Sequence, residues 1–184
     1  MIISNLFVMK NRILSVFCIL LLLGGCKKKK EGIEALPEAT QVGKNTFGCL
    51  VNGVVFIPKA PGIPISLSTS YQFVDGKYLY SLYATRVEGN DRKSFFINAK
   101  DVMLEEKMYA LTQFDTSQSF SGRFSSSVGN ISDNYETSPS LQGEIRITKV
   151  DQVKRIIAGT FWFDAENKDG QKVEVREGRF DSTY

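Results

Sequence analysis

Hydrophobic and polar residues alternate along most of the chain from Asn45 onward, and turn dipeptides separate the alternating runs. A period of two is typical of strands that bury one face. Thr46–Val51 and Val54–Ile57 flank Asn52-Gly53. Asn-Gly between apolar runs predicts a tight hairpin, because a type I′ turn requires positive φ at both central residues.

This two-residue turn determines which side chains of the hairpin lie on the same face. It pairs Val51 with Val54 and Cys49 with Phe56. Phe47, Cys49, Val51, Val54 and Phe56 therefore share one face, which we expect to face the core. Cys49 is accordingly interpreted as a small core residue and not as a reactive thiol.

Further alternating runs predict strands at residues 65–71, 72–74, 78–85, 94–99, 141–150, 153–165 and 171–177. Val102–Met108 is the one helical candidate, and residues 115–140, rich in Ser, Gly, Asn and Asp, are predicted to be loops and short edge strands. Gly178 fits a β-bulge. The expected fold is all-β: an antiparallel β-sandwich or open β-barrel of roughly eight to ten strands over residues 45–184.

The last predicted hairpin carries a candidate contact residue. Phe161 and Phe163 alternate with Trp162, and Val173 and Val175 alternate with polar residues. We expect the phenylalanines and valines to be buried and Trp162 to lie on the opposite face. A large aromatic side chain on a polar face suggests a contact surface for a ligand or partner.

The N-terminal residues have the organisation of an export signal. The apolar run Ile13–Leu23 follows the basic stretch Lys10-Asn11-Arg12 and precedes Gly24-Gly25, as in a secretory signal peptide. The run is shorter than the roughly 20 apolar residues that span a bilayer. We therefore predict a signal peptide over residues 1–25. Met9-Lys10-Asn11-Arg12 is itself a conventional signal-peptide start, which gives the hypothesis that translation begins at Met9.

Leu23, the two glycines and Cys26 together resemble the lipobox of bacterial lipoproteins. The resemblance implies that the Cys26 thiol takes a diacylglyceryl group, that the preceding peptide is cut, and that the new amine is acylated with a fatty acid such as palmitate. Lys27–Lys30 would then lie beside an anionic membrane surface, each adding about 1 kcal/mol of attraction, or form a solvated tether. Residues 26–44 are predicted to be the lipidated cysteine and a flexible tether.

Two stretches of the domain also resemble a Bacteroidota lipoprotein family that is known only as a domain of unknown function. The first is Gly43–Gly53, which contains Phe-Gly-Cys-Leu-Val-Asn-Gly, and the second combines Gly159-Thr160-Phe161 with Gly178–Asp181. The resemblance implies a lipid-anchored, β-rich envelope protein and no known activity. Surface-exported lipoproteins of this phylum tend to carry acidic residues after the cysteine. Lys27–Lys30 therefore favour an outer-membrane anchor that faces the periplasm.

Composition excludes several classes of chemistry. The chain has no histidine, which removes Ser-His-Asp and Cys-His catalysis and the commonest metal ligand. Of its 23 Lys and Arg residues, six lie in the signal or at Lys27–Lys30, and the remaining 17 are outnumbered by 20 Asp and Glu. Nucleic-acid binding is therefore not expected. Cys49 has no intrachain disulfide partner once Cys18 is removed and Cys26 is acylated.

These patterns support two hypotheses about function, neither of them enzymatic. The first is a lipid-anchored envelope protein whose β-domain serves binding or structure, with an envelope protein or glycan as its partner. The second is a carrier or sensor of a small apolar ligand in a β-barrel pocket, lined by some of the 13 Phe and 7 Tyr residues. A filled interior would favour the first hypothesis and an open apolar cavity the second. No cofactor is expected.

Overall fold

The computed structural model describes residues 31–62, 65–113 and 118–184. Within them the chain forms eleven strands, one 3₁₀ turn, η1 (Gly32–Ala35), and no α-helix. The strands are β1 (Thr46–Val51), β2 (Val54–Phe56), β3 (Leu67–Val74), β4 (Lys77–Glu88), β5 (Asp91–Lys100), β6 (Met108–Ala110), β7 (Ser119–Val128), β8 (Ile131–Glu136), β9 (Gly143–Asp151), β10 (Ile156–Glu166) and β11 (Lys172–Thr183).

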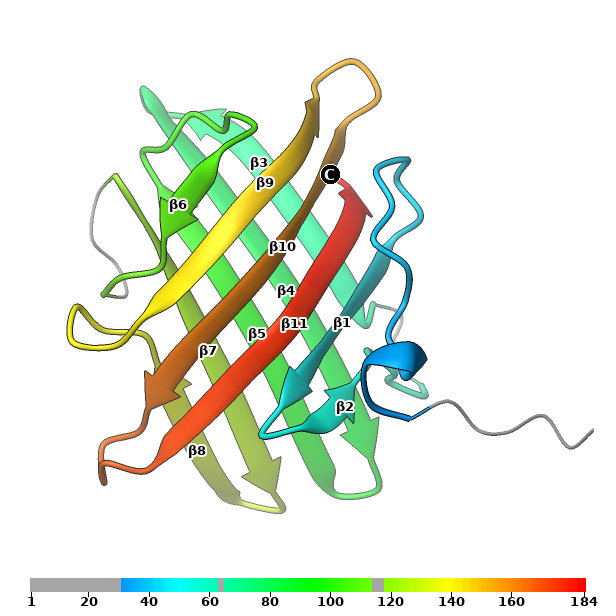
Figure 1. Ribbon diagram of the computed structural model, residues 1–184, viewed down its shortest axis with the longest axis vertical. Coiled ribbons are helices and arrows are strands. Elements are labelled where there is room, and N and C mark those ends of the chain that lie inside the picture. Colours follow the sequence, from blue (N-terminus) through cyan, green and yellow to red (C-terminus); the bar gives the residue numbers. More distant parts are fainter. Residues whose placement is uncertain (1–30, 63–64, 114–117) are drawn as a thin grey trace, which may run out of the picture. The chain divides into compact units, whose positions relative to one another are not determined.

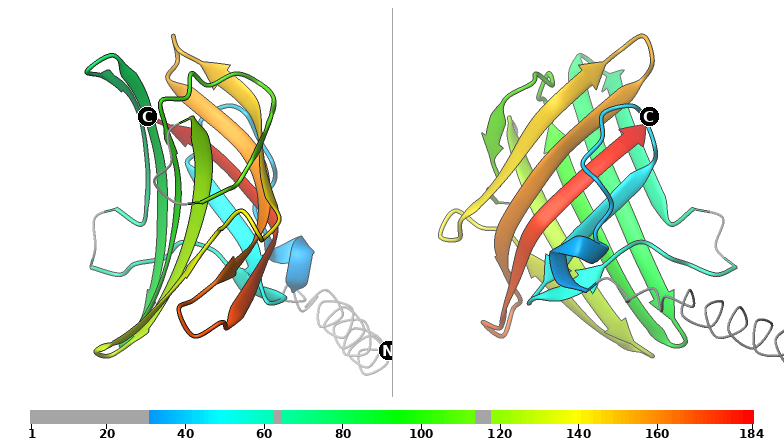
Figure 2. Two further views of the ribbon diagram at one scale, coloured as in Figure 1. Left: turned by 90° about the vertical axis from the view of Figure 1, so that its left-hand side faces the viewer. Right: turned by 45° about the vertical axis from the view of Figure 1, so that its right-hand side comes forward.

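The strands make one large, open antiparallel sheet that is folded into two layers (Figures 1 and 2). Its order is β2-β1-β11-β10-β8-β7-β5-β4-β3, and β9 pairs with both β10 and β6. One layer contains β2, β1, β11, β10, β9 and β6, and the other contains β8, β7, β5, β4 and β3. A single residue pair, Glu166 with Glu136, joins β10 to β8. The all-β prediction is confirmed, with more strands than expected.

The first hairpin has the predicted turn and register. Asn52 and Gly53 have φ values of 48° and 78°, and Val51 pairs with Val54 while Cys49 pairs with Phe56. Cys49 and Phe56 are buried, but Val54 is 65% exposed. The predicted register is thus confirmed. The core covers Cys49 and Phe56, but it does not cover Val54 beside the turn.

The structure contradicts the helix predicted at Val102–Met108. These residues form an irregular connection, and Met108 begins strand β6, which pairs with β9. Val102 and Leu104 are buried, and the Leu104 N–H donates to the Tyr71 hydroxyl at 3.0 Å. Burial at every second residue is the period of extended chain, so the core packs this segment in a form that excludes a helix.

Residues 115–140 were predicted to contain only loops and edge strands, which is also wrong. Strand β7 is ten residues long and lies between β5 and β8. Its Phe120 and Phe124 are buried. Between them, a Cβ atom on Gly122 would lie 3.1 Å from the Phe163 ring. Glycine has low strand propensity, but the close approach of the Phe163 ring favours it at this position.

The closing hairpin has the predicted alternation. Phe161 and Phe163 on β10 are buried, whereas Trp162 is partly exposed. A bulge interrupts the pairing with β11, because Phe161 pairs with Gly178 but Phe163 pairs with Val175. A Cβ atom on Gly178 would lie 2.5 Å from the Phe161 ring. The predicted bulge is therefore present, and its glycine makes room for a core phenylalanine.

Phe95 lies at the centre of the core between the two layers. Its ring centroid is 4.8 Å from that of Phe56, 5.0 Å from Phe124 and 5.6 Å from Phe47. Phe163 follows at 6.3 Å. Aromatic pairs at such distances are worth about 0.5–1.5 kcal/mol beyond the area they bury. The interior at this level is filled by side chains.

Residues 31–44, which the sequence placed in the tether, contact the domain. Leu36 is buried, and a Cβ atom on Gly48 would lie 2.6 Å from Pro37. The η1 turn lies beside β2 (Figure 1). The predicted tether residues before Glu31, including Cys26, lie outside the described residues.

The Asp181 carboxylate holds this N-terminal segment on β11. It accepts hydrogen bonds from the Thr40 hydroxyl at 2.6 Å and from the backbone N–H groups of Val42, Gly43 and Lys44 at 3.1, 2.7 and 3.2 Å. Burial alone would raise the pKa of Asp181. The four hydrogen bonds outweigh burial and lower that pKa, because each stabilises the ionised carboxylate.

We predict that Asp181→Asn lowers the free energy of unfolding at pH 7 by about 1–3 kcal/mol, because four partly buried donors lose a charged acceptor. A carboxyl whose pKa is lowered on folding stabilises the protein above its unfolded pKa of about 3.9, and this contribution is lost as the pH falls through the folded pKa. Denaturant titrations should therefore show the difference from the unmodified protein shrinking at low pH. Asp75→Asn, in an exposed hairpin turn, is the control. An equal difference at pH 7 and pH 3 would contradict the prediction.

Candidate functional site

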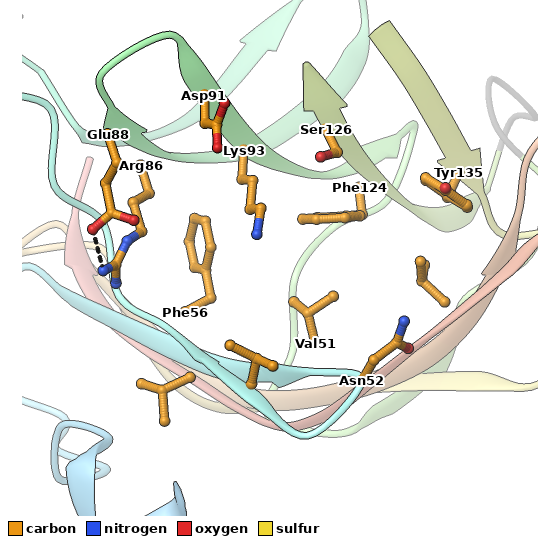
Figure 3. Close-up of a pocket in the computed structure, with 13 residues that line it drawn as sticks. Val51, Asn52, Phe56, Arg86, Glu88, Asp91, Lys93, Phe124, Ser126 and Tyr135 are labelled. Carbon is orange, nitrogen blue, oxygen red and sulfur yellow. Dashed lines mark hydrogen bonds and ion pairs between the residues drawn. The ribbon is translucent and has the colours of Figure 1, made fainter. Parts of the chain in front are cut away.

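A pocket of about 370 Å³ opens between the two layers at one end of the domain (Figure 3). We call it the mouth pocket. The β1–β2 turn borders it on one side, and the ends of β4 and β5 border it on the other. β4 and β5 are twelve and ten residues long, whereas the facing β1 and β2 have six and three. The inner face of the longer hairpin therefore continues beyond the strands that would cover it.

The floor of the mouth pocket is apolar and mostly aromatic. Phe56, Phe124 and Val173 are buried beneath it, and Val51 and Tyr135 are partly exposed on its walls. The Phe124 and Tyr135 rings are 6.0 Å apart. The floor is continuous with the core, because Phe56 and Phe124 both contact Phe95.

Charged residues of β4 and β5 form the rim of the pocket. Arg86 pairs with Lys93 across the two strands, and Glu88 pairs with Asp91 one step farther from the core. An Arg86 guanidinium N–H donates to Glu88 at 2.5 Å. This hydrogen bond is the main cause of the lowered pKa of Glu88. Figure 3 shows the Lys93 side chain extending from β5 toward Phe56 and Phe124.

Trp162, the contact residue predicted from the sequence, lies elsewhere, on the outer face of β9, β10 and β11. Its indole N–H donates to Glu144 at 3.3 Å, and the Arg176 guanidinium lies 5.5 Å from its ring centroid. Arg176 also donates to Asp164 at 2.6 Å. Trp162 lines a shallow groove of about 610 Å³ with Arg146 and other residues. Its ring is thus held in place by neighbouring charged groups.

The two sites differ in how well the sequence indicated them. Trp162 was predicted as a contact residue, but Arg86 and Lys93 were missed. The alternation along each strand could have indicated them, because both occupy positions on the inward face. Arg86 follows buried Leu82 and Ala84 at the same spacing of two, and Lys93 lies two residues before buried Phe95. A charged residue in phase with the core marks the position where an inward face reaches solvent.

Cys49 is fully buried and forms no disulfide in the part of the chain that the structure describes. Burial raises the pKa of its thiol, because the thiolate would lose its hydration. Among the described residues, no three Cys, Asp or Glu side chains are grouped so as to hold a metal ion. No helix in the same residues has the length and apolar character needed to cross a membrane.

Comparison with protein families identifies the domain. The profile of a domain of unknown function, DUF6252, matches residues 74–183. This range contains β4 to β11, and with them the cationic rim of the mouth pocket and Trp162. No curated protein and no solved structure matches the chain. Because the profile covers more than half of the chain, the protein belongs to the DUF6252 family.

Proposed function

We propose that this protein is a non-enzymatic binding protein of the bacterial cell envelope, in which the mouth pocket holds a small, largely apolar ligand. The observation that carries the proposal is the pocket itself: an aromatic floor, open to solvent, with a few charged groups at its rim. Ligand sites in proteins have this composition and volumes of about 300–1,000 Å³. The interior is filled at the level of Phe95, which favours the first hypothesis from the sequence, but the mouth pocket beyond that level is open. We therefore adopt the carrier or sensor, with its ligand held at the mouth.

The absence of histidine from the chain supports binding over catalysis. The charged residues at the rim are arranged as an ion pair and a lysine, with no nucleophile held by a general base. Cys49, the nucleophile of highest intrinsic reactivity in the domain, is buried and has a raised pKa. A site of this kind can hold and release a ligand without changing it.

The anchor is proposed from the sequence. Leu23, the two glycines and Cys26 have the lipobox pattern, and Lys27–Lys30 favour an outer-membrane anchor that faces the periplasm. With the lipid on Cys26, the domain would act at the membrane surface of a Bacteroidota cell.

The Trp162 groove supports a second proposal, a contact with an envelope protein or glycan. The supporting observation is that a partly exposed aromatic ring and three arginines line one groove on a sheet face. Trp and Arg are the residues most enriched at protein-binding hot spots.

We predict that Ser126→Trp abolishes binding of the uncharged dye N-phenyl-1-naphthylamine, because Ser126 lines the mouth pocket and a tryptophan would fill it. Dye fluorescence during titration is the measurement. Ser127→Trp is the matched control, since the Ser127 hydroxyl faces Ser132 on the other side of the sheet. Failure of the unmodified protein to bind the dye, or equal binding by both variants, would refute a ligand site in this pocket.

For the anchor, we predict that Cys26→Ser moves the protein from the detergent phase to the aqueous phase in a two-phase partition of expressing bacteria. The substitution removes the thiol that would carry the lipid. Cys49→Ser is the control, because Cys49 is buried in the domain and its replacement should leave partitioning unchanged. Retention of the Cys26→Ser protein in the detergent phase would disprove the lipid anchor.

For the groove, we predict that Trp162→Ala lowers the free energy of unfolding by about 1 kcal/mol, corresponding to one lost hydrogen bond, and reduces recovery of envelope proteins or glycans bound to the domain. Phe163→Ala, on the buried side of the same strand, should cost about 3–5 kcal/mol. Thermal denaturation and co-purification measure the two effects. Unchanged recovery with Trp162→Ala would remove the groove as a binding surface.

A further inference from the structure

We infer that the ligand of the mouth pocket is an amphipathic anion, an apolar chain or ring system that ends in one carboxylate or phosphate group. The charged end would lie against Arg86 and Lys93, and the apolar part would lie on the floor formed by Phe56 and Phe124. This inference rests on the proposed function and adds the chemical class of the ligand.

The pairing of β4 with β5 places two cationic side chains opposite each other. Arg86 and Lys93 are directly paired on β4 and β5, and both line the pocket. Two like charges that face each other across a strand pair destabilise a sheet. An anion placed between them would relieve this repulsion.

The partners of these two cations differ. Arg86 already donates to Glu88. Lys93 interacts with Glu88 only through its charge, and no hydrogen bond or salt bridge of its ammonium is found among the described residues. Ser126 is paired with Lys93 on its other side and also lines the pocket. Lys93 therefore offers free N–H donors, with a hydroxyl next to it, at the edge of the apolar floor.

The order of the charges along the strands selects an anion over a cation. On the inner face, the Arg86–Lys93 pair is next to the core, because the neighbouring pair on that face, Ala84 and Phe95, is fully buried. The acidic pair, Glu88 and Asp91, is the next pair on the same face in the direction of solvent. A ligand whose apolar part contacts the floor brings its charged end to the cationic pair first. Charge-assisted hydrogen bonds there are about twice as strong as neutral ones.

The test is displacement of N-phenyl-1-naphthylamine from the mature chain without its lipid (Cys26→Ser). This form is suitable because Glu31–Tyr184 forms one compact unit with its own core. Four amphiphiles with the same twelve-carbon chain are compared below their micellar concentrations: laurate, dodecyl phosphate, dodecanol and dodecyltrimethylammonium. We expect one or both anions to displace the dye at concentrations at least about tenfold lower than dodecanol, equivalent to about 1.4 kcal/mol. The comparison of laurate with dodecyl phosphate decides between the two head groups.

Variants assign the preference to the rim. Lys93→Met should reduce the preference for anions over dodecanol about tenfold, and Lys93→Glu should shift the preference toward dodecyltrimethylammonium. Lys77→Met, which removes a lysine at the opposite end of β4, is the control. Equal displacement by dodecanol and the anions, or stronger displacement by the cation, would overturn the inference and leave the proposed ligand site standing. Absence of dye binding would overturn both.

Discussion

The aromatic contacts around Phe95 are the interaction on which the rest of the structure depends. Phe95 comes from one layer, and it contacts Phe47 and Phe56 from the other. Burying these apolar rings between the layers stabilises their contact. The same core accounts for the glycine in the bulge at position 178, because a side chain there would collide with the Phe161 ring.

The mouth pocket forms because β4 and β5 extend beyond the end of the aromatic core. The β4–β5 hairpin is longer than the β1–β2 hairpin that faces it. Beyond Phe95 the inner face of β5 therefore continues with Lys93, and the inner face of β4 continues with Arg86. A mismatch in strand length thus produces a site in which an apolar floor meets a charged rim, with no rearrangement of the core.

Much of the fold could be predicted, because local rules decide it. The Asn52-Gly53 turn determines the register of its hairpin, and the alternation in β10 identifies Phe163 as buried. The errors have a common cause. In Val102–Met108 and in β7, local propensity favours a helix or a loop, and packing against distant residues overrides it. Gly122 illustrates the point, since the Phe163 ring, distant in the sequence, packs closely against this strand glycine.

The sequence by itself determined the strand faces and the first and last hairpins, because each depends on neighbouring residues and backbone geometry. Only the tertiary structure decided which faces are covered. Alternation places Arg86 and Lys93 on the same side as the core, but it cannot say that the opposite layer ends before reaching them. That depends on the relative lengths and offsets of strands far apart in the chain, which nonlocal packing sets.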